Sequence, residues 1–182
     1  TGTAPSQIDY YAVSRGPGSF TGLRIGIAAI KGLAFPDNTP CVGVSTPEAI
    51  AYGLLGFTGT VVPMMDARCG QVYTALFQGR DGTLTRLTED EALPLPTLYE
   101  KLKDCPAPLW LCGDGAHLGL AAWQGELPVR MAPAHLCYQH ASAVGLAALQ
   151  HLAEAVPPAA LVPCYLRPAN AMTLAQRQQN NE

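Results

Sequence analysis

Residues 15–26 read RGPGSFTGLRIG, and this glycine-rich stretch joins a short β-rich run to a helical one. The run before it, Ile8 to Val13, is typical of a strand, and Phe20 to Phe35 carry apolar residues at helical density. The glycines of the GPG segment allow backbone dihedrals that other residues resist, and Ser19 can cap the following helix. The stretch therefore predicts a strand, a sharp turn and a helix.

The next part of the chain predicts a second strand and a second helix. Prolines within residues 36–40 break the first helix, and CVGV over 41–44 is typical of a buried strand. Ser45-Thr46-Pro47-Glu48 has the pattern of a capping box with proline in the first turn, which predicts a helix to about Leu55. The first part of the chain thus runs strand, helix, strand, helix.

Three consecutive strands are predicted after this, over residues 60–67, 70–78 and 83–88. The turns ARCG and GRDG between them favour an antiparallel meander. The remaining elements are helices near Leu98–Lys103, near His117–Trp123 and from about Ala141 to Ala155, and strands over 108–112 and 128–131.

This second order of elements is close to that of a ribonuclease-H-like lobe, whereas the first part shows only the closing half of such a lobe. We therefore expect an N-terminal lobe that lacks its opening strands and first helix, over residues 1–59. A complete C-terminal lobe is predicted over 60–169. Residues 170–182 are polar without a periodic face, and a flexible tail is expected there.

Composition excludes several classes of function. The formal net charge is -3, and no run of Lys or Arg could follow a phosphate backbone, so the chain is not expected to bind nucleic acid by itself. No apolar run reaches the roughly 18 residues that a membrane span needs. The first residues lack the basic and apolar segments of an export signal. We therefore expect a globular cytoplasmic protein.

The six cysteines are scattered without a CxxC pair and lie mostly in apolar segments, which predicts buried, reduced thiols. A zinc site would need a tighter set, and His135 and His140 are five residues apart, which does not place them on one helix face. Glu89, Asp90 and Glu91 follow a strand and are interpreted as a solvated polar loop. No metal site and no catalytic set is predicted.

Three motifs together carry a resemblance to a known family. RGPGSFTGLRIG over 15–26, MDARCGQVY over 65–73 and PCYLR over 163–167 resemble, in this order, the signatures of the TsaB (YeaZ) family. The resemblance implies the α/β fold of the actin-like superfamily of sugar kinases and heat-shock chaperones, with two ribonuclease-H-like lobes. It also implies an opening strand with an Asp-Thr phosphate loop, which this sequence does not contain.

The helix over 20–35 has more apolar surface than one sheet can cover. Thr21, Arg24, Ala28 and Lys31 form one narrow stripe, and apolar residues occupy most of the remaining circumference. Two interpretations of this surface are open: it packs on a missing first helix of the same chain, or it binds a second protein. Gly22 and Gly26, four residues apart, remove side chains from one patch, and with Ala29 they would let another helix approach closely.

The resemblance implies that this helix pairs with the catalytic paralogue TsaD, or with a second copy in a homodimer. The predicted partner-binding residues are Ser19, Thr21, Gly22, Leu23, Arg24, Ile25, Gly26, Ala29 and Ile30.

Nucleotide or anion binding is the rival hypothesis. The GPG turn exposes N–H groups that could hold an anion, although a purely structural turn is the favoured interpretation. Asp66 ends a strand where relatives place a phosphate-loop carboxylate, but an ion pair with Arg68 would also explain it. The candidate contacts are Arg15, Gly16, Gly18, Asp66, Gly113 and Gly115.

The favoured hypothesis is a non-catalytic subunit that binds TsaD and, through the complex, TsaE. It would support threonylcarbamoyl transfer to the tRNA adenosine beside the anticodon, and would meet tRNA only through the complex. No cofactor is expected on this chain, because the resemblance places ATP and metal on TsaD. The alternative is an ATP-binding or ATP-hydrolysing enzyme of the same superfamily.

Overall fold

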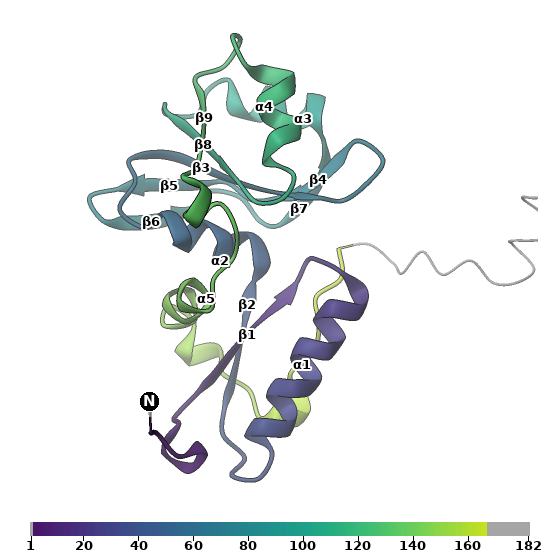
Figure 1. Ribbon diagram of the computed structural model, residues 1–182, viewed down its shortest axis with the longest axis vertical. Coiled ribbons are helices and arrows are strands. Elements are labelled where there is room, and N and C mark those ends of the chain that lie inside the picture. Colours follow the sequence, from purple (N-terminus) through teal and green to yellow (C-terminus); the bar gives the residue numbers. More distant parts are fainter. Residues whose placement is uncertain (1, 167–182) are drawn as a thin grey trace, which may run out of the picture.

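The computed structural model describes residues 2–166, which form two β-sheets with helices on their faces. Figure 1 shows a two-stranded sheet (the small sheet) below a seven-stranded sheet (the large sheet). The tail predicted over 170–182 lies outside the described residues. No helix within 2–166 combines the length and the apolar character needed to cross a membrane.

The small sheet consists of the parallel strands β1 (Tyr11–Gly16) and β2 (Cys41–Ser45). The connecting helix α1 (Phe20–Ala34) lies on one side of the two strands, and α5 (Ala141–Ala148) lies on the other (Figure 1). β1 begins later than predicted and continues into the glycine-rich stretch, because its last residues still pair with β2 across a bulge. The predicted strand, turn and helix are otherwise confirmed.

Both predicted helix caps are present. The Ser19 hydroxyl accepts a hydrogen bond from the Gly22 N–H at 3.3 Å, and the Ser45 hydroxyl accepts one from the Glu48 N–H at 3.2 Å. The second helix, α2 (Thr46–Ala51), ends earlier than predicted and continues as a 3-10 turn. The Glu48 side chain is engaged with Arg86 and His151.

The large sheet is organised around β3 (Gly59–Asp66), which is antiparallel to β4 (Gln71–Thr74) and β5 (Phe77–Arg80). The run predicted as one strand over 70–78 is therefore divided in two. The division lies opposite Pro63, which has no N–H to donate to a neighbouring strand. The predicted meander is confirmed, with this interruption.

The other strands extend the large sheet on both sides. β6 pairs with β5, β7 pairs with β4, and β8 lies parallel to β3 and is itself followed by β9. The strands are β6 (Thr83–Arg86), β7 (Glu91–Pro94), β8 (Leu109–Cys112) and β9 (Val129–Met131). The mixed sheet predicted for this part of the chain is confirmed, and β7 is an additional strand.

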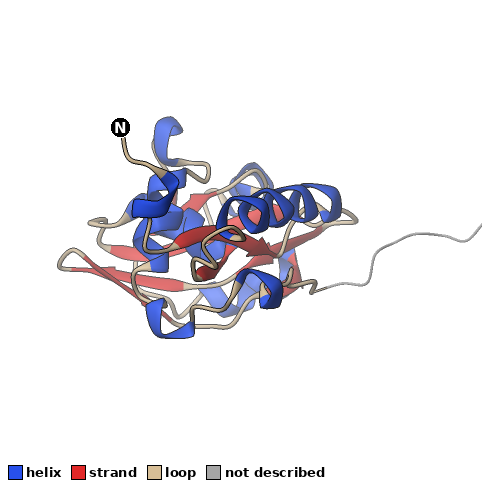
Figure 2. Ribbon diagram, turned by 90° about the horizontal axis from the view of Figure 1, so that it is seen from below, coloured by secondary structure: helices blue, strands red, loops and turns tan. Residues whose placement is uncertain are grey.

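Two helices, α3 (Leu95–Leu102) and α4 (Ala116–Trp123), pack against the large sheet. Figure 2 shows helices above and below the strands, which form the interior. α5 is shorter than the helix predicted to about Ala155. Short 3-10 turns lie at Pro5–Gln7, Tyr52–Leu54, Ala134–Leu136, Leu152–Glu154 and Pro158–Ala160.

The junction between the two sheets is built on α2, all of whose residues are buried. Ile50, Ala51 and Leu54 share a core cluster with Val61 of β3 and Phe77 of β5. Leu54 is fully buried, and truncation of such a side chain to alanine costs about 2–5 kcal/mol. The division of the chain into two lobes at residue 59 stays a prediction.

The segment after α5 returns to the small sheet. Val156 pairs with Cys41 of β2, Leu161 is buried beside Ile27 of α1, and the Cys164 N–H donates to the Arg15 carbonyl at 2.7 Å. The returning segment thus covers the flank of α1 and the open end of β1.

All six cysteines are free. Cys41, Cys112 and Cys137 are buried as expected, and burial raises the pKa of the Cys112 thiol. The expectation of burial is wrong for Cys69, which is exposed in the turn between β3 and β4.

Candidate functional site

The inward face of α1 packs on the small sheet. Ile27 and Ala34 are buried, and they share a core cluster with Cys41 and Leu161. Ile30 is half-buried against the same cluster. One face of the helix therefore packs entirely within the molecule.

The outward face of α1 is both apolar and exposed. Its members recur at a spacing of three or four residues, which places them along one side of the helix. Ile25 is 65% exposed and Leu33 is 53% exposed. A side chain added at Gly32 would meet nothing within 4 Å. We call this face the α1 stripe; it comprises Gly22, Ile25, Ala29, Gly32 and Leu33.

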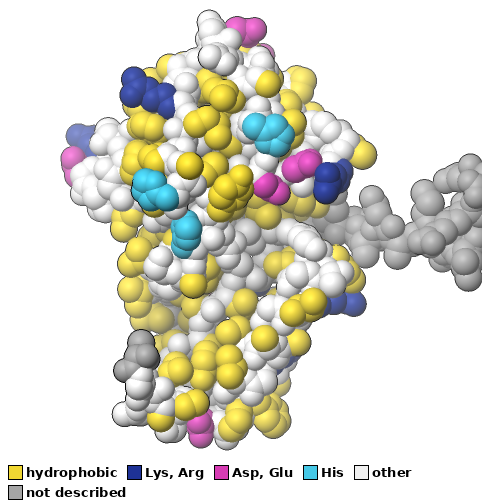
Figure 3. Space-filling view, in the orientation of Figure 1, with side chains coloured by type: hydrophobic (Ala, Val, Ile, Leu, Met, Phe, Trp, Pro, Cys, Tyr) yellow, Lys and Arg dark blue, Asp and Glu magenta, His cyan; other side chains and the backbone are white. Residues whose placement is uncertain are grey.

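The space-filling view shows hydrophobic side chains at the surface of the lower part of the molecule, where Figure 1 places α1 (Figure 3). Gly22 of the stripe and Gly26 next to it line a hollow of about 310 Å³, together with Val13 and Met65. The two glycines thus leave one patch of the helix without side chains, as the sequence predicted.

The polar flank of α1 is held by the returning segment. Arg24 Nε donates to the Tyr165 hydroxyl at 3.1 Å, and its guanidinium lies 3.8 Å from the centre of the Phe20 ring. The Phe20 and Tyr165 rings stack at 4.9 Å. Lys31 Nζ donates to the Ala159 carbonyl at 3.2 Å. This flank therefore has an internal role in addition to any role in binding.

The predicted partner-binding residues do not all face outward. Half-buried members are Leu23, Gly26 and Ile30; exposed members are Ser19, Thr21, Gly22, Arg24, Ile25 and Ala29. The predicted set of partner-binding residues omits Gly32, Leu33 and the 74%-exposed Phe35. The spacing from Ile25 through Ala29 continues into them and could have revealed them.

A second hollow, of about 380 Å³, opens between the start of α1 and the large sheet. Gly18 and Ser19 line it from one side, and Asp66, Arg68 and Asp114 line it from the other. The structure thus brings two of the predicted anion contacts, Gly18 and Asp66, to one place.

Asp66 is engaged locally. Arg68 Nη1 lies 3.3 Å from Asp66 Oδ2, and the Arg68 N–H donates to Asp66 Oδ1 at 2.7 Å. The predicted ion pair is confirmed; because the Arg68 side chain is 86% exposed, it contributes at most about 1 kcal/mol. The Asp66 N–H in turn donates to Asp114 Oδ1 at 3.1 Å.

The other predicted nucleotide contacts do not line this hollow, although a Cβ on Gly115 would lie only 3.0 Å from the Asp66 nitrogen. The Gly113 N–H donates to the Cys137 carbonyl and the Gly115 N–H donates to the Met64 carbonyl, so these amides are occupied within the fold. Gly16 lies directly against the Cys164 carbonyl. Arg15 stands over Gly43 and lines a different hollow.

That different hollow belongs to a charged cluster that sequence reasoning missed. The interpretation of Glu89, Asp90 and Glu91 as a solvated loop is wrong for two of them. The Asp90 side chain is 15% exposed and accepts hydrogen bonds from Arg86 Nη1 and the Ser45 hydroxyl. Glu91 begins β7 and pairs with Lys101 at 2.6 Å. The partners of this cluster are too far apart in sequence for spacing to reveal them.

Among residues 2–166, no three His, Cys, Asp or Glu side chains lie together in a way that could hold a metal ion.

Comparison with known proteins gives consistent matches. The family model described as TsaD, tRNA N6-adenosine threonylcarbamoyltransferase, matches residues 1–174. The tRNA threonylcarbamoyladenosine biosynthesis protein TsaB of Bacillus subtilis (strain 168) is 34% identical over 92% of this chain and 73% of its own length. TsaB of Escherichia coli (strain K12) is 36% identical over 68% of this chain and 52% of its own length.

Solved structures give the same result. YeaZ from Pseudomonas aeruginosa has a TM-score of 0.68 and 28% identity over 91% of this chain and 76% of its own. A second Pseudomonas aeruginosa structure, described as similar to peptidase YeaZ, has a TM-score of 0.68 and 26% identity over 91% of this chain and 77% of its own. The predicted actin-like α/β fold is confirmed by this likeness. The chain belongs to the TsaB (YeaZ) family.

Proposed function

We propose that this chain is a non-catalytic subunit in tRNA threonylcarbamoyladenosine biosynthesis and that its α1 stripe binds TsaD. The observation that carries the proposal is the exposure of Ile25 and Leu33 on a helix whose opposite face is already buried. The names of the curated relatives support the pathway.

The composition of the stripe suits a helical partner. Gly22, Ala29 and Gly32 have little or no side chain, so a second helix could approach α1 closely. Ile25 and Leu33 would then supply apolar area, which stabilises a complex by roughly 25 cal/mol per Å² before the costs of association. A second copy of the chain could use the same stripe, which makes a homodimer a competing state of the same surface.

The non-catalytic role is supported by how polar groups are used in the hollow at the start of α1. Asp66 is paired with Arg68, and the amides of Gly113 and Gly115 bond to backbone carbonyls. A nucleotide would have to displace these partners. We further propose that ATP and metal bind to TsaD and not to this chain, and that TsaE and tRNA meet this chain only through the complex.

The test is calorimetric binding of TsaD to the parent and to three variants. Ile25→Asp puts a charge in the stripe, and Gly22→Leu and Gly26→Leu hold the partner helix away. A Cβ at either glycine meets only ordinary contacts, so the backbone at both positions can carry a side chain. Each should weaken binding by about 2 kcal/mol or more.

Leu149→Asp is the matched control, because Leu149 is 59% exposed and lies beyond α5, away from the stripe. Parent-like binding by Ile25→Asp, Gly22→Leu and Gly26→Leu would contradict the proposed interface. Stoichiometric binding and hydrolysis of ATP by the isolated chain would instead favour the enzyme hypothesis.

A further inference from the structure

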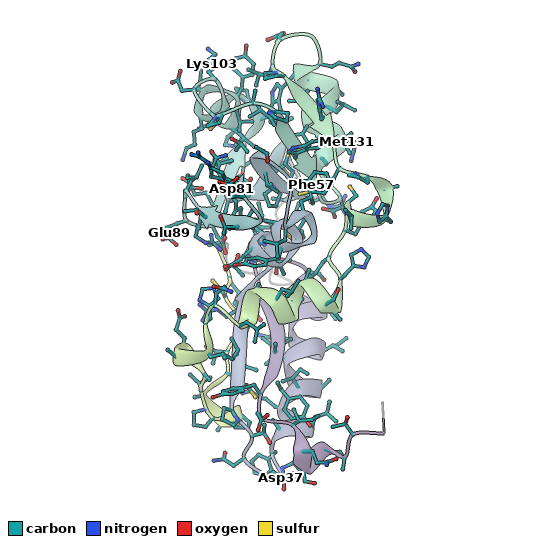
Figure 4. The ribbon with its side chains drawn as sticks, turned by 90° about the vertical axis from the view of Figure 1, so that its left-hand side faces the viewer. Asp37, Phe57, Asp81, Glu89, Lys103 and Met131 are labelled. Carbon is teal, nitrogen blue, oxygen red and sulfur yellow. The ribbon has the colours of Figure 1, made fainter. Side chains whose placement is uncertain are left out.

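A closed ring of hydrogen bonds ties α2 to the connection between β6 and β7. Glu48 Oε2 accepts from Arg86 Nη2 at 3.1 Å, and Arg86 Nη1 donates to Asp90 Oδ1 at 2.9 Å. The Ser45 hydroxyl donates to the same Asp90 oxygen at 2.8 Å and accepts from the Glu48 N–H. Figure 4 shows neighbouring Glu89 near the level at which the large sheet meets the small one. The ring therefore lies at the junction of the two sheets.

His151 joins this ring to the segment that follows α5. Its Nε2 lies 3.0 Å from Glu48 Oε1, and its Nδ1 lies 3.0 Å from Glu154 Oε1. An ionised carboxylate only accepts hydrogen bonds, and a neutral imidazole has a single N–H. Both contacts are hydrogen bonds only when His151 carries two ring protons and a positive charge.

The charges around His151 favour that protonated state. Burial by itself would lower the pKa of His151, but hydrogen bonds to Glu48 and Glu154 and the charges of these carboxylates outweigh it, and the pKa lies above its usual value of 6.5. The hollow that Arg15 also lines contains further charges. The charged and titratable residues that line it are Arg15, Glu48, Arg86, Glu89, Asp90, His151 and Glu154.

Arg86, which also bonds to Glu48, cannot take over the contact that His151 makes with this carboxylate. Arg86 is bonded to Glu48 Oε2 and to Asp90, so Glu48 Oε1 depends on the imidazole. The Glu48 side chain is 9% exposed, and an unpaired charge at such a position is costly. Loss of the His151 proton therefore leaves a ring nitrogen without hydrogen facing a carboxylate oxygen.

We propose that His151 is a proton-operated clasp. When charged it bonds both Glu48 of α2 and Glu154; when neutral it has one N–H, loses one of the two contacts, and holds the segment from His151 to Ala155 less tightly. The segment beyond it pairs with β2 at Val156 and contacts Lys31 of α1 at Ala159. Opening of the clasp thus loosens the start of the segment that covers the flank of α1. The inference stands on these contacts and is independent of the proposed TsaD binding.

The direction of the pH effect follows from the raised pKa. A group whose pKa is higher in the folded than in the unfolded state contributes its full stability below the unfolded value, here 6.5. That contribution is lost as the pH rises through the folded value. The clasp is therefore closed in mild acid and opens on the alkaline side of 6.5.

The test is amide hydrogen exchange by NMR at about pH 6 and about pH 8.5, on either side of the histidine range. The Glu154 and Ala155 amides bond within the segment, and their protection, corrected for intrinsic exchange, should fall several-fold at the higher pH. The Ala132 amide, which bonds to Leu111 of β8, should change little. Direct titration of the His151 ring signals should give a pKa above 6.5.

Two variants separate the clasp from general effects of pH. His151→Gln should show low protection of the Glu154 and Ala155 amides at both pH values, whereas His117→Gln, at an exposed histidine of α4, should behave like the parent. Glu154→Gln keeps the Glu48 contact and should move the midpoint of opening toward lower pH. Equal protection of these amides at both pH values in the parent, or the same pH-dependent loss in His151→Gln, would overturn the proposal.

Discussion

Arg24 Nε donates a hydrogen bond to the hydroxyl of Tyr165 at 3.1 Å, which links the first turns of α1 to a residue near the end of the described chain. Both side chains also contact Phe20: the guanidinium lies over its ring, and the Tyr165 ring stacks on it. The helix that carries the proposed binding stripe is thus fixed along one flank by its own chain. A partner can then meet a helix whose position is already set.

Substitution of Tyr165 should lower the free energy of unfolding, and the loss should grow with the amount of side chain removed. Tyr165→Phe loses the hydrogen bond and keeps the stacking, which should cost about 0.5 kcal/mol at this exposed site. Tyr165→Ala loses both and should cost about 1–2 kcal/mol. Urea unfolding measures both, with Tyr138→Ala as a control at another exposed tyrosine. Indistinguishable stabilities of the two Tyr165 variants and the parent would show that the stacked cluster does not hold the flank.

Gly16 should tolerate no side chain. Its φ is +127°, and an added Cβ would lie against the carbonyl oxygen of Cys164, whose N–H bonds to Arg15. Gly16→Ala should therefore cost about 3 kcal/mol and displace the returning segment.

Gly82→Ala is the control for backbone strain alone, because Gly82 has a φ of +74° and nothing within 4 Å of an added Cβ. It should cost about 1 kcal/mol. Thermal unfolding compares the two variants, and equal losses would mean that the Cys164 contact adds nothing.

Arg86 should contribute far more to the free energy of unfolding than the exposed Arg80. The Arg86 side chain is 26% exposed and bonds to the 9%-exposed Glu48, so Arg86→Met leaves a largely buried carboxylate with fewer partners. We expect Arg86→Met to lower the free energy of unfolding by about 3 kcal/mol. Arg80 and Asp81 are 78% and 86% exposed, and Arg80→Met should change stability by less than about 0.5 kcal/mol. Denaturant unfolding near neutral pH measures both losses. Similar free energies of unfolding for the two variants would show that the ring does not stabilise the fold.

Local chemistry in the sequence predicted the helix starts and most of the strand order. Ser19 and Ser45 cap their helices because a cap needs only a hydroxyl and the next turn of backbone. The early end of α5 was missed, because apolar periodicity continues to Leu152 while the chain turns to bring His151 to Glu48. The break between β4 and β5 was missed because it depends on Pro63 of the opposite strand.

The candidate site also has one part that the sequence predicted and one part that it did not. The surplus of apolar residues on α1 is a property of one helix, so the sequence indicated it before the fold was known. The ring joins Ser45 and Glu48 to Arg86 and Asp90, and only the packing of two sheets brings these together. Contacts that depend on tertiary structure have no periodic signature in the sequence.

Hydrogen exchange along β1 should alternate from residue to residue. In the part of the chain that the structure describes, β1 pairs with a strand on one edge only, through β2. The Tyr11 N–H donates to the Pro40 carbonyl, and neighbouring residues of a strand direct their amides to opposite edges, so Ala12 directs its own away from β2 and Val13 toward it. β3 differs, because β5 and β8 pair with its two edges, and Val61 and Val62 should both be protected.

We expect the Ala12 amide to be at least about tenfold less protected than that of Val13, and both less than Val62, in dilute protein by NMR. Equal protection of Ala12 and Val13 would show that the open edge of β1 is covered, and a rise of Ala12 protection with protein concentration would identify a second copy as the cover.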